Sequence, residues 1–395
     1  MYHTFSLLAL AALQVCAIPN AGHEPWIERQ PLVPRLALAP ETKRYPEIRA
    51  TNDTTSSNAS NFLWLLQDTF DGSNFFDNFA FFTGDDPTQY VDKNTAFANN
   101  LSYVSDRGTV IMKGDNTTWL PTGQNRQSVR VSSFAQYTGG LFILDSNKAP
   151  WGCVGVWPAF WTLGADGTWP QSGEIDVLEG VHDNEHNQVT WHTRANCSLT
   201  ATAPFTGSVV QSNGVNYTDC EGGTAANKPG CGIIEWSRAT YGPTFDAQGG
   251  GVFAMKWDQD GIAVWSFYRV AVPQDIKDGT PDPSGWGSPS AALSPQGCDI
   301  GSYFYNHSII FAIDITFCGD WAGNSYATSG CPGTCPDRLV DPSNFDNATW
   351  DINWLRVYRR QTIPGVVSEG RPRSMVSVGA VILTGLCVTV GMMVL

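Results

Sequence analysis

Three carboxylates, those of Glu174, Asp176 and Glu179, stand close together in the stretch GEIDVLEG. In a β-strand, successive side chains point to opposite faces, so Glu174 and Asp176 would share one face. Strict alternation would turn Glu179 toward the other, apolar face, where an unpaired carboxylate is costly. A β-bulge adds one residue to a strand and would return Glu179 to the acidic face. The sequence therefore predicts a bulged strand whose extra residue is Val177 or Leu178.

Three carboxylates on one face repel one another, so at least one of them should keep its proton well above the ordinary pKa of about 4. An ionised carboxylate beside a carboxylic acid is the pair that glycoside hydrolysis needs. The alternatives are a solvated acidic strand face and a calcium site. Solvated faces usually mix in Lys, Thr or Ser, and calcium loops are rich in Asp, Asn and Gly, whereas apolar residues separate these acids. The pattern therefore favours catalysis.

Aromatic residues flank the acidic strand on both sides. Residues 155–164 read GVWPAFWTLG, Trp169 and Pro170 stand just before the acids, and residues 188–193 read QVTWHT. Together with the acids, this run resembles the active-site region of the family 16 glycoside hydrolases, in the branch of fungal laminarinase-like endo-1,3(4)-β-glucanases. The resemblance extends over about residues 62–360.

The resemblance gives each acid a role. It implies that Glu174 is the nucleophile, that Glu179 is the acid/base, and that Asp176 is the carboxylate between them that assists the nucleophile. The implied reaction passes through a covalent glycosyl-enzyme and retains the anomeric configuration. We expect no cofactor and no metal.

Five more residues are candidates for substrate binding. By resemblance, Trp161 and Trp169 stack on sugar rings on the glycone side of the cleft, and Trp321 is a match on the other side. His192 matches a family histidine near the acid/base, although a strand histidine can also cap a backbone group. Arg130 would hydrogen-bond sugar hydroxyls, with a surface salt bridge as the alternative.

Short apolar or alternating runs recur from Phe62 onward and predict the strands that hold these residues. No window keeps a 3.6-residue period, so the chain is predicted to be all-β. The resemblance implies a β-jelly roll, a sandwich of two curved antiparallel sheets with a concave substrate cleft. Trp157 and Trp191 are core candidates, since a tryptophan in a sandwich strand is usually packed. The predicted strands cover 62–67, 102–106, 109–113, 127–133, 141–145, 156–163, 174–179, 187–193, 252–257, 261–269, 308–317 and 352–358.

Two long segments, 200–250 and 271–300, are rich in Gly, Pro and small polar residues and are predicted to be loops that wall the groove. The first would be pinned by a disulfide. Eight of the ten cysteines lie outside the apolar end segments, which permits up to four disulfides. Zinc is the alternative for the motif CPGTC at 331–335, but no histidine or second close cysteine pair completes four ligands.

The chain ends lie outside the predicted catalytic domain, residues 61–362. Residues 1–17 are typical of a secretory signal peptide, and residues 18–60 of a Pro/Ser/Thr-rich spacer or propeptide. Residues 363–374 are predicted to be a linker with a candidate GPI attachment site, followed by the hydrophobic anchor signal 375–395. We therefore expect a secreted protein held at the cell surface, on the plasma membrane or in the cell wall, with a transmembrane anchor as the alternative.

Charge and glycosylation motifs limit the partners. The net charge of −14 argues against nucleic acid and anionic lipid surfaces. A chain with 15 Trp can cover the apolar faces of sugar rings, so the expected partner is a β-glucan polysaccharide, bound by a monomer. Eight Asn-x-Ser/Thr sequons fit a secreted glycoprotein; they are at Asn52, Asn58, Asn100, Asn116, Asn196, Asn216, Asn306 and Asn347.

The predicted function is endo-acting hydrolysis of β-1,3- and mixed β-1,3/1,4-glucans. One alternative is a cell-wall glucan transglycosylase of the same fold, but such relatives tend to carry the acids in strict alternation, Glu-x-Asp-x-Glu. The other is a non-catalytic β-glucan-binding protein, but such relatives lose one or both glutamates. Here all three acids are present and one extra residue separates them, so hydrolysis is favoured.

Overall fold

The computed structural model describes residues 62–84, 86–200, 204–212, 214–223, 228–315, 326 and 329–362. The predicted signal peptide (1–17), spacer (18–60), linker (363–374) and anchor signal (375–395) lie outside these residues, and so does Trp321. No helix within the described ranges is long and apolar enough to span a membrane.

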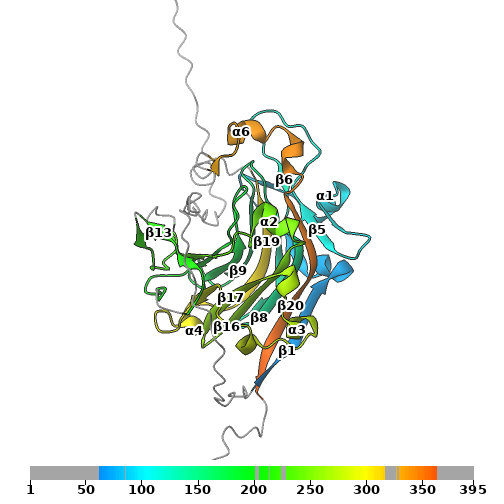
Figure 1. Cartoon of the computed structure of the whole chain (residues 1–395). Coiled ribbons are helices and arrows are strands. Elements are labelled where there is room, and N and C mark those ends of the chain that lie inside the picture. The colour runs from blue at the N-terminus through cyan, green and yellow to red at the C-terminus, as the bar shows by residue number, and fades with distance from the viewer. Residues whose placement is uncertain are drawn as a thin grey trace, which may run out of the picture.

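Two antiparallel sheets of eight strands each pack face to face, and both are curved (Figure 1). We call the one that carries the acids the site sheet. In spatial order its strands are β12 (Ser208–Val209), β15 (Cys231–Ile234), β11 (Gln188–His192), β10 (Glu174–Glu179), β9 (Trp157–Gly164), β19 (His307–Asp314), β7 (Arg130–Tyr137) and β2 (Phe79–Phe81).

The other sheet, here the outer sheet, takes strands from both ends and from the middle of the described chain. In spatial order its strands are β18 (Ala291–Leu293), β17 (Gly261–Tyr268), β16 (Gly251–Asp258), β8 (Gly140–Lys148), β20 (Thr349–Thr362), β5 (Val110–Lys113) and β4 (Ser102–Val104). The eighth strand, β1 (Phe62–Asp71), also pairs with β20, and the two run side by side to one end of the molecule (Figure 1).

The remaining elements are short. Four two-residue strands form two small separate sheets: β3 (Gln89–Tyr90) pairs with β6 (Gln127–Ser128), and β13 (Gln211–Ser212) pairs with β14 (Val215–Asn216). The described helices are α1 (Lys93–Ala98), α2 (Gly242–Ala247), α3 (Gln274–Lys277), α4 (Ile300–Tyr303) and α6 (Cys335–Arg338), with 3-10 turns η1 (Gly72–Asp77), η2 (Arg269–Ala271), η3 (Pro283–Gly285) and η4 (Pro342–Phe345).

The main core lies between the two sheets, where apolar side chains of alternate strand residues meet. Phe160 and Phe311 of the site sheet stack at 4.9 Å between ring centroids. A second apolar cluster covers the far face of the outer sheet and includes Leu141, Ile143 and Val252. Both faces of β8 and β16 are thus buried, which explains their nearly continuous apolar sequences.

The all-β prediction is confirmed, and every predicted strand has a counterpart in the structure. The segments 200–250 and 271–300 were predicted as loops without strands, and this was wrong in part. Strand β15 lies in the first segment and pairs along β11, and β18 lies in the second and pairs with β17. Both are too short to show a clear two-residue period, and their neighbours fix them in the sheets.

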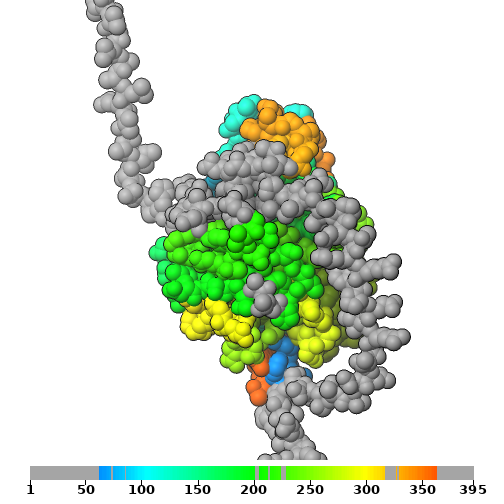
Figure 2. Space-filling model, turned by 60° about the vertical axis from the view of Figure 1, so that its left-hand side comes forward, coloured from blue at the N-terminus to red at the C-terminus, as the bar shows by residue number. Residues whose placement is uncertain are grey.

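Disulfides tie the long loops to the sandwich. Cys220 joins Cys231 within the first loop region, as predicted, and Cys197 joins Cys298. In Figure 2 the green surface of the loops after β11 adjoins the yellow surface of the loops before β19, the two parts that this second bridge connects. Cys331 joins Cys153, and Cys335 is also disulfide-bonded, so the CPGTC motif forms disulfides rather than a zinc site.

Candidate active site

The predicted bulge is present in the acidic strand. Along the pairing of β10 with β9, Asp176 lies opposite Trp161 and Leu178 lies opposite Phe160, so Val177 is the extra residue. Val177 and Leu178 are both fully buried in the main core. Two consecutive apolar side chains therefore point inward, which ordinary strand alternation would not allow.

The bulge brings Glu179 back to the face that holds the other two acids. Its Oε1 accepts a hydrogen bond of 3.0 Å from the indole Nε1 of Trp157, on β9. Its Oε2 accepts one of 3.3 Å from the hydroxyl of Thr190, on β11. Glu179 is only 2% exposed, so donors from both neighbouring strands orient an almost fully buried carboxyl group.

Glu174 is oriented by a different tryptophan. The indole Nε1 of Trp169 donates a hydrogen bond of 2.8 Å to its Oε2. On its other side lies His192, whose Nε2 is 3.8 Å from Glu174 Oε1 and 3.4 Å from Asp176 Oδ2. Glu174 and Asp176 are fully buried and share His192 as a neighbour, whereas Glu179 has partners of its own.

His192 lies beside the nucleophile candidate Glu174 and beside Asp176, and its expected place near the acid/base candidate stays a prediction. The antiparallel pairing puts His192 directly opposite Glu174, and Thr190 is the residue of the same strand that reaches Glu179. Gly230 makes this position possible, because its φ is +79° and a Cβ there would lie 2.5 Å from His192 Nδ1.

The buried His307 supports the strand from beneath. Its Nε2 lies 2.7 Å from the Ser172 carbonyl oxygen, and its Nδ1 lies 2.9 Å from the Thr162 hydroxyl. Burial lowers the pKa of His307 to about 4, so the ring is neutral at neutral pH. The Nε2–H then donates to Ser172 and Nδ1 accepts from Thr162, which fixes the chain two residues before Glu174.

The predicted sugar-stacking and sugar-binding residues take different positions. Trp169 is half-buried, and its ring lies 5.8 Å from that of His192. Trp161 is 2% exposed and packs with Ile310 on the site face. The Arg130 guanidinium lies 5.1 Å from the Trp161 ring centroid and also covers Phe82, which is a cation–π arrangement. Their contacts with sugar stay predictions, as does the role of Trp321.

A family model described as an XgeA-like, catalytic GH16 domain matches residues 79–358. The chain belongs to glycoside hydrolase family 16. The two antiparallel sheets are the jelly roll of this family, and the protein is a glycoside hydrolase.

Two of the curated relatives of this family-16 chain are the following fungal proteins. A probable glycosidase of Schizosaccharomyces pombe is 41% identical, over 75% of this chain and 69% of the relative. A probable endo-1,3(4)-β-glucanase of Aspergillus flavus is 35% identical over 78% of this chain, which spans only 46% of that relative's length.

Two solved structures of the family show the same fold. Laminarinase 16A from Phanerochaete chrysosporium, with 6-O-glucosyl-laminaritriose in its donor and acceptor sites, is 39% identical with a TM-score of 0.69 over 75% of this chain and 99% of that one. An elongating family 16 β-1,3-glucosyltransferase is 35% identical with a TM-score of 0.68, over 75% of this chain and all of that one (100%).

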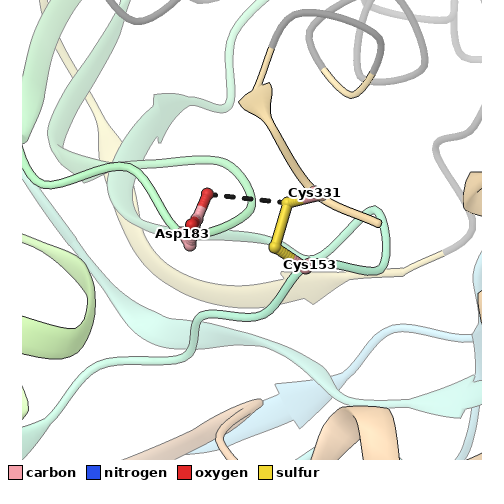
Figure 3. Close-up of side chains that lie close together, drawn as sticks. All are labelled: Cys153, Asp183 and Cys331. Atoms are coloured by element: carbon pink, nitrogen blue, oxygen red, sulfur yellow. Dashed lines mark hydrogen bonds between the residues drawn. A yellow bond between two sulfur atoms is a disulfide. The ribbon is translucent and has the colours of Figure 1, made fainter. Parts of the chain in front are cut away.

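Two groups of described residues bring together three side chains that could bind a metal. One is Cys153, Asp183 and Cys331, in which the sulfurs form a disulfide (Figure 3). The Asp183 carboxylate lies 3.6 Å from Cys331 Sγ, but neither sulfur is a thiolate that could hold a metal. The other group is Glu174, Asp176 and His192, the buried acids and histidine of the candidate active site.

The sequence reading missed the donors that orient Glu179. Trp157 was a core candidate and is buried as predicted (1% exposed), but its indole Nε1 also donates to Glu179. The signal was present, since Trp157 and Trp161 are an even number of residues apart and therefore share a strand face. Trp191, the other core candidate, is fully buried in the main core as predicted.

Proposed function

We propose that the protein cleaves β-1,3-glucans and mixed β-1,3/1,4-glucans within the chain, by a retaining double displacement. The observation that carries the proposal is the bulged strand with Glu174, Asp176 and Glu179 on one buried face. The printed names of the relatives, an endo-1,3(4)-β-glucanase and a laminarinase among them, support the substrate class.

In the first step, an oxygen of Glu174 attacks the anomeric carbon while the bond from that carbon to the leaving oxygen breaks. Glu179 gives its proton to the leaving oxygen, which departs as a new sugar hydroxyl. In the second step, Glu179 takes a proton from a water molecule whose oxygen attacks the same carbon. The bond to Glu174 breaks, and the product keeps the β configuration.

The separate surroundings of the two glutamates suit these two roles. Glu179 is held by neutral donors, an indole and a hydroxyl, which can stay in place while it gains or loses a proton. Glu174 shares its space with Asp176 and His192, the latter 3.4 Å from Asp176. We assign Asp176 to orienting the nucleophile, with His192 as its neighbour across the strands.

A glucan transglycosylase is the second candidate function. It is favoured by the 35% identity to the elongating family 16 β-1,3-glucosyltransferase. The extra residue Val177 in the acidic strand favours hydrolysis, because transglycosylating relatives tend to alternate strictly. Transfer and hydrolysis share the first step and differ in whether a sugar or water attacks the glycosyl-enzyme.

Product analysis separates these functions. Purified protein is incubated with laminarin or barley β-glucan, with and without added laminari-oligosaccharide acceptor, and the products are resolved by chromatography. Hydrolysis predicts internal cleavage to short oligosaccharides that the acceptor changes little, whereas a transglycosylase would yield products longer than the acceptor. A Glu174→Gln variant, which keeps size and polarity, is expected to bind laminarin without turnover. No products from either glucan with wild-type protein would refute the proposal.

We also propose that the protein works outside the cytoplasm as a monomer held at the cell surface. Its disulfides fit an oxidising compartment, and the six sequon asparagines within the described residues are all exposed or half-buried. The anchor rests on the apolar composition of residues 375–395. Phosphatidylinositol-specific phospholipase C should release active protein from cells, and light scattering of the released protein should give the mass of one chain. Failure of the lipase to release activity would contradict the lipid anchor.

A further inference from the structure

The bulge leaves backbone groups of β10 that the neighbouring strand does not reach. Pairing of β10 with β11 runs from Glu174 to Asp176, which lies opposite Thr190, and goes no further. The carbonyl of Val177 and the N–H of Glu179 follow in the buried interior, where an unpaired backbone group is costly.

The side chain of Asn187 supplies both missing partners. Its Oδ1 accepts a hydrogen bond of 2.8 Å from the Glu179 N–H. Its Nδ2 donates one of 2.9 Å to the Val177 carbonyl oxygen. Asn187 stands just before β11 and is fully buried, so a side-chain amide continues the ladder in place of backbone.

Further contacts fix the direction of this amide. The Nδ2 also donates 3.2 Å to Oε1 of Glu235, and the Asn187 backbone N–H donates 2.9 Å to the Thr240 hydroxyl. If the amide were turned over, its oxygen would face the Val177 carbonyl oxygen and its NH₂ group would face the Glu179 N–H, so both hydrogen bonds would be lost. Only one orientation satisfies all three neighbours.

Glu235 connects this amide to the outer sheet. Its Oε1 lies 2.6 Å from the Ser266 hydroxyl and 3.0 Å from the Ser290 hydroxyl. Ser266 belongs to β17 and Ser290 directly precedes β18, so the network spans both layers of the sandwich. Burial raises the pKa of Glu235 to about 7, so much of it carries a proton at neutral pH and needs no cation nearby.

We propose that Asn187 is the positioning residue for Glu179: it binds the backbone on both sides of Leu178, sets the shape of the bulge, and thereby aims the acid/base carboxyl at the leaving oxygen. This inference rests on the proposed function, because it takes Glu179 as the proton donor. Asn187 contacts no reacting atom itself. A general acid contributes about 10²- to 10⁴-fold, and a misplacement of about 1 Å can cost about 100-fold.

The test uses the dependence of the rate on the leaving group. A 2,4-dinitrophenolate leaves without a proton, whereas a 4-methylumbelliferyl group or a sugar needs more help from the acid. The first-turnover rate is measured in a stopped-flow instrument with the two aryl β-laminaribiosides for wild type, Asn187→Ala, Asn187→Asp and Glu179→Ala. Stopping at the first turnover avoids the second step, in which Glu179 acts as base.

We expect Asn187→Ala to slow release of the poorer leaving group by roughly 100-fold and to leave dinitrophenolate release within about fivefold of wild type. Asn187→Asp keeps the acceptor for the Glu179 N–H but loses the donor to the Val177 carbonyl oxygen. It should therefore slow release of the poorer leaving group selectively as well, but by a smaller factor. It also answers the question if the alanine variant does not fold. The control is Asn147→Ala, which removes a comparable amide from a polar network of the outer sheet.

Asn147→Ala should lower the melting temperature while the rates with both substrates stay unchanged. Equal losses with both substrates in the two Asn187 variants, or no loss in either, would overturn the inference, because a merely structural role does not distinguish leaving groups. Failure of the proposed function looks different: Glu179→Ala itself would then fail to spare the dinitrophenyl substrate. If Glu179→Ala slows only the poorer leaving group and the Asn187 variants do not, the proposed function stands and only the positioning role of Asn187 is refuted.

Discussion

Deleting Val177 removes the bulge while keeping all three acids. The register with β9 can survive, because Leu178 already lies opposite Phe160 and Glu179 opposite Ala159. The variant strand would read Glu-Ile-Asp-Leu-Glu, a regular alternation with the acids on one face. The deletion therefore tests the local shape of the strand rather than the presence of its carboxylates.

The expected cost in stability follows from the contacts of Val177. Its side chain is fully buried, which contributes about 1.5–3 kcal/mol to the free energy of unfolding. Its carbonyl oxygen accepts from Asn187, and losing that pairing costs about 1–3 kcal/mol. The total of about 2.5–6 kcal/mol is less than the stability of many domains, so a weakened fold is expected.

The expected cost in rate is larger than this stability loss alone explains. One residue fewer shortens the strand path by about 3.3 Å, and a shift of about 1 Å at the reacting centre already costs about 100-fold. We expect hydrolysis of laminarin to fall at least about 100-fold at a temperature where the variant is folded, with a larger share of transfer products. Reducing-end release and chromatography measure both quantities.

A Val177→Ala variant is the matched control, because it keeps the extra residue and loses only packing. It should lose about 2 kcal/mol of stability and keep its rate within a few-fold of wild type. The reasoning is refuted if the deletion variant folds and hydrolyses laminarin at the wild-type rate. It is also refuted if Val177→Ala loses as much activity as the deletion.

Three further predictions concern single contacts. Trp157→Phe keeps an aromatic ring but removes the indole N–H that donates to Glu179 over 3.0 Å. We expect kcat on laminarin to fall about tenfold with little change in KM. An unchanged kcat would show that this hydrogen bond has no part in catalysis. Burial raises the pKa of Glu235 to about 7 from 4.5, so the folded state binds the proton more tightly than the unfolded chain does. The protein therefore loses up to about 3 kcal/mol of its free energy of unfolding as pH rises through 7. The Glu235→Gln variant should lack this loss when urea unfolding is compared at pH 5 and pH 8. His307 makes stability depend on pH in the opposite direction, because its pKa is lowered to about 4 and the unfolded chain binds the proton at a higher pH. Up to about 3 kcal/mol of the free energy of unfolding is therefore lost as pH falls from about 6.5 to 4. An equally steep loss of stability at acid pH in the His307→Gln variant would argue against this residue as the cause.

Exclusion of charge from the core made the acidic strand predictable. Glu179 could not face the interior, Val177 and Leu178 could, and only one extra residue satisfies all three, as the register shows. The strands with clear alternation or long apolar runs were predictable for the same reason, because their apolar residues must face a buried side of a sheet. Burial is a strong local constraint, and a linear sequence displays it directly.

Contacts between segments distant in the chain were not predictable in this way. Glu235 reaches Asn187 from a loop 48 residues away, and no local pattern marks either residue. The position of His192 opposite Glu174 depends on the strand register, which the sequence does not display. The short strand β15 is held by pairing with β11 more than by its own composition.

The assignment of Glu174 as nucleophile is the central claim, and trapping the intermediate tests it most directly. The protein is treated with 2-deoxy-2-fluoro-β-laminaribiosyl fluoride, whose electron-poor ring slows release of the glycosyl-enzyme, and is then digested and mapped by mass spectrometry. We expect one added laminaribiosyl group, on Glu174, and none on a Glu174→Gln variant. A label on Asp176 or Glu179 would contradict it.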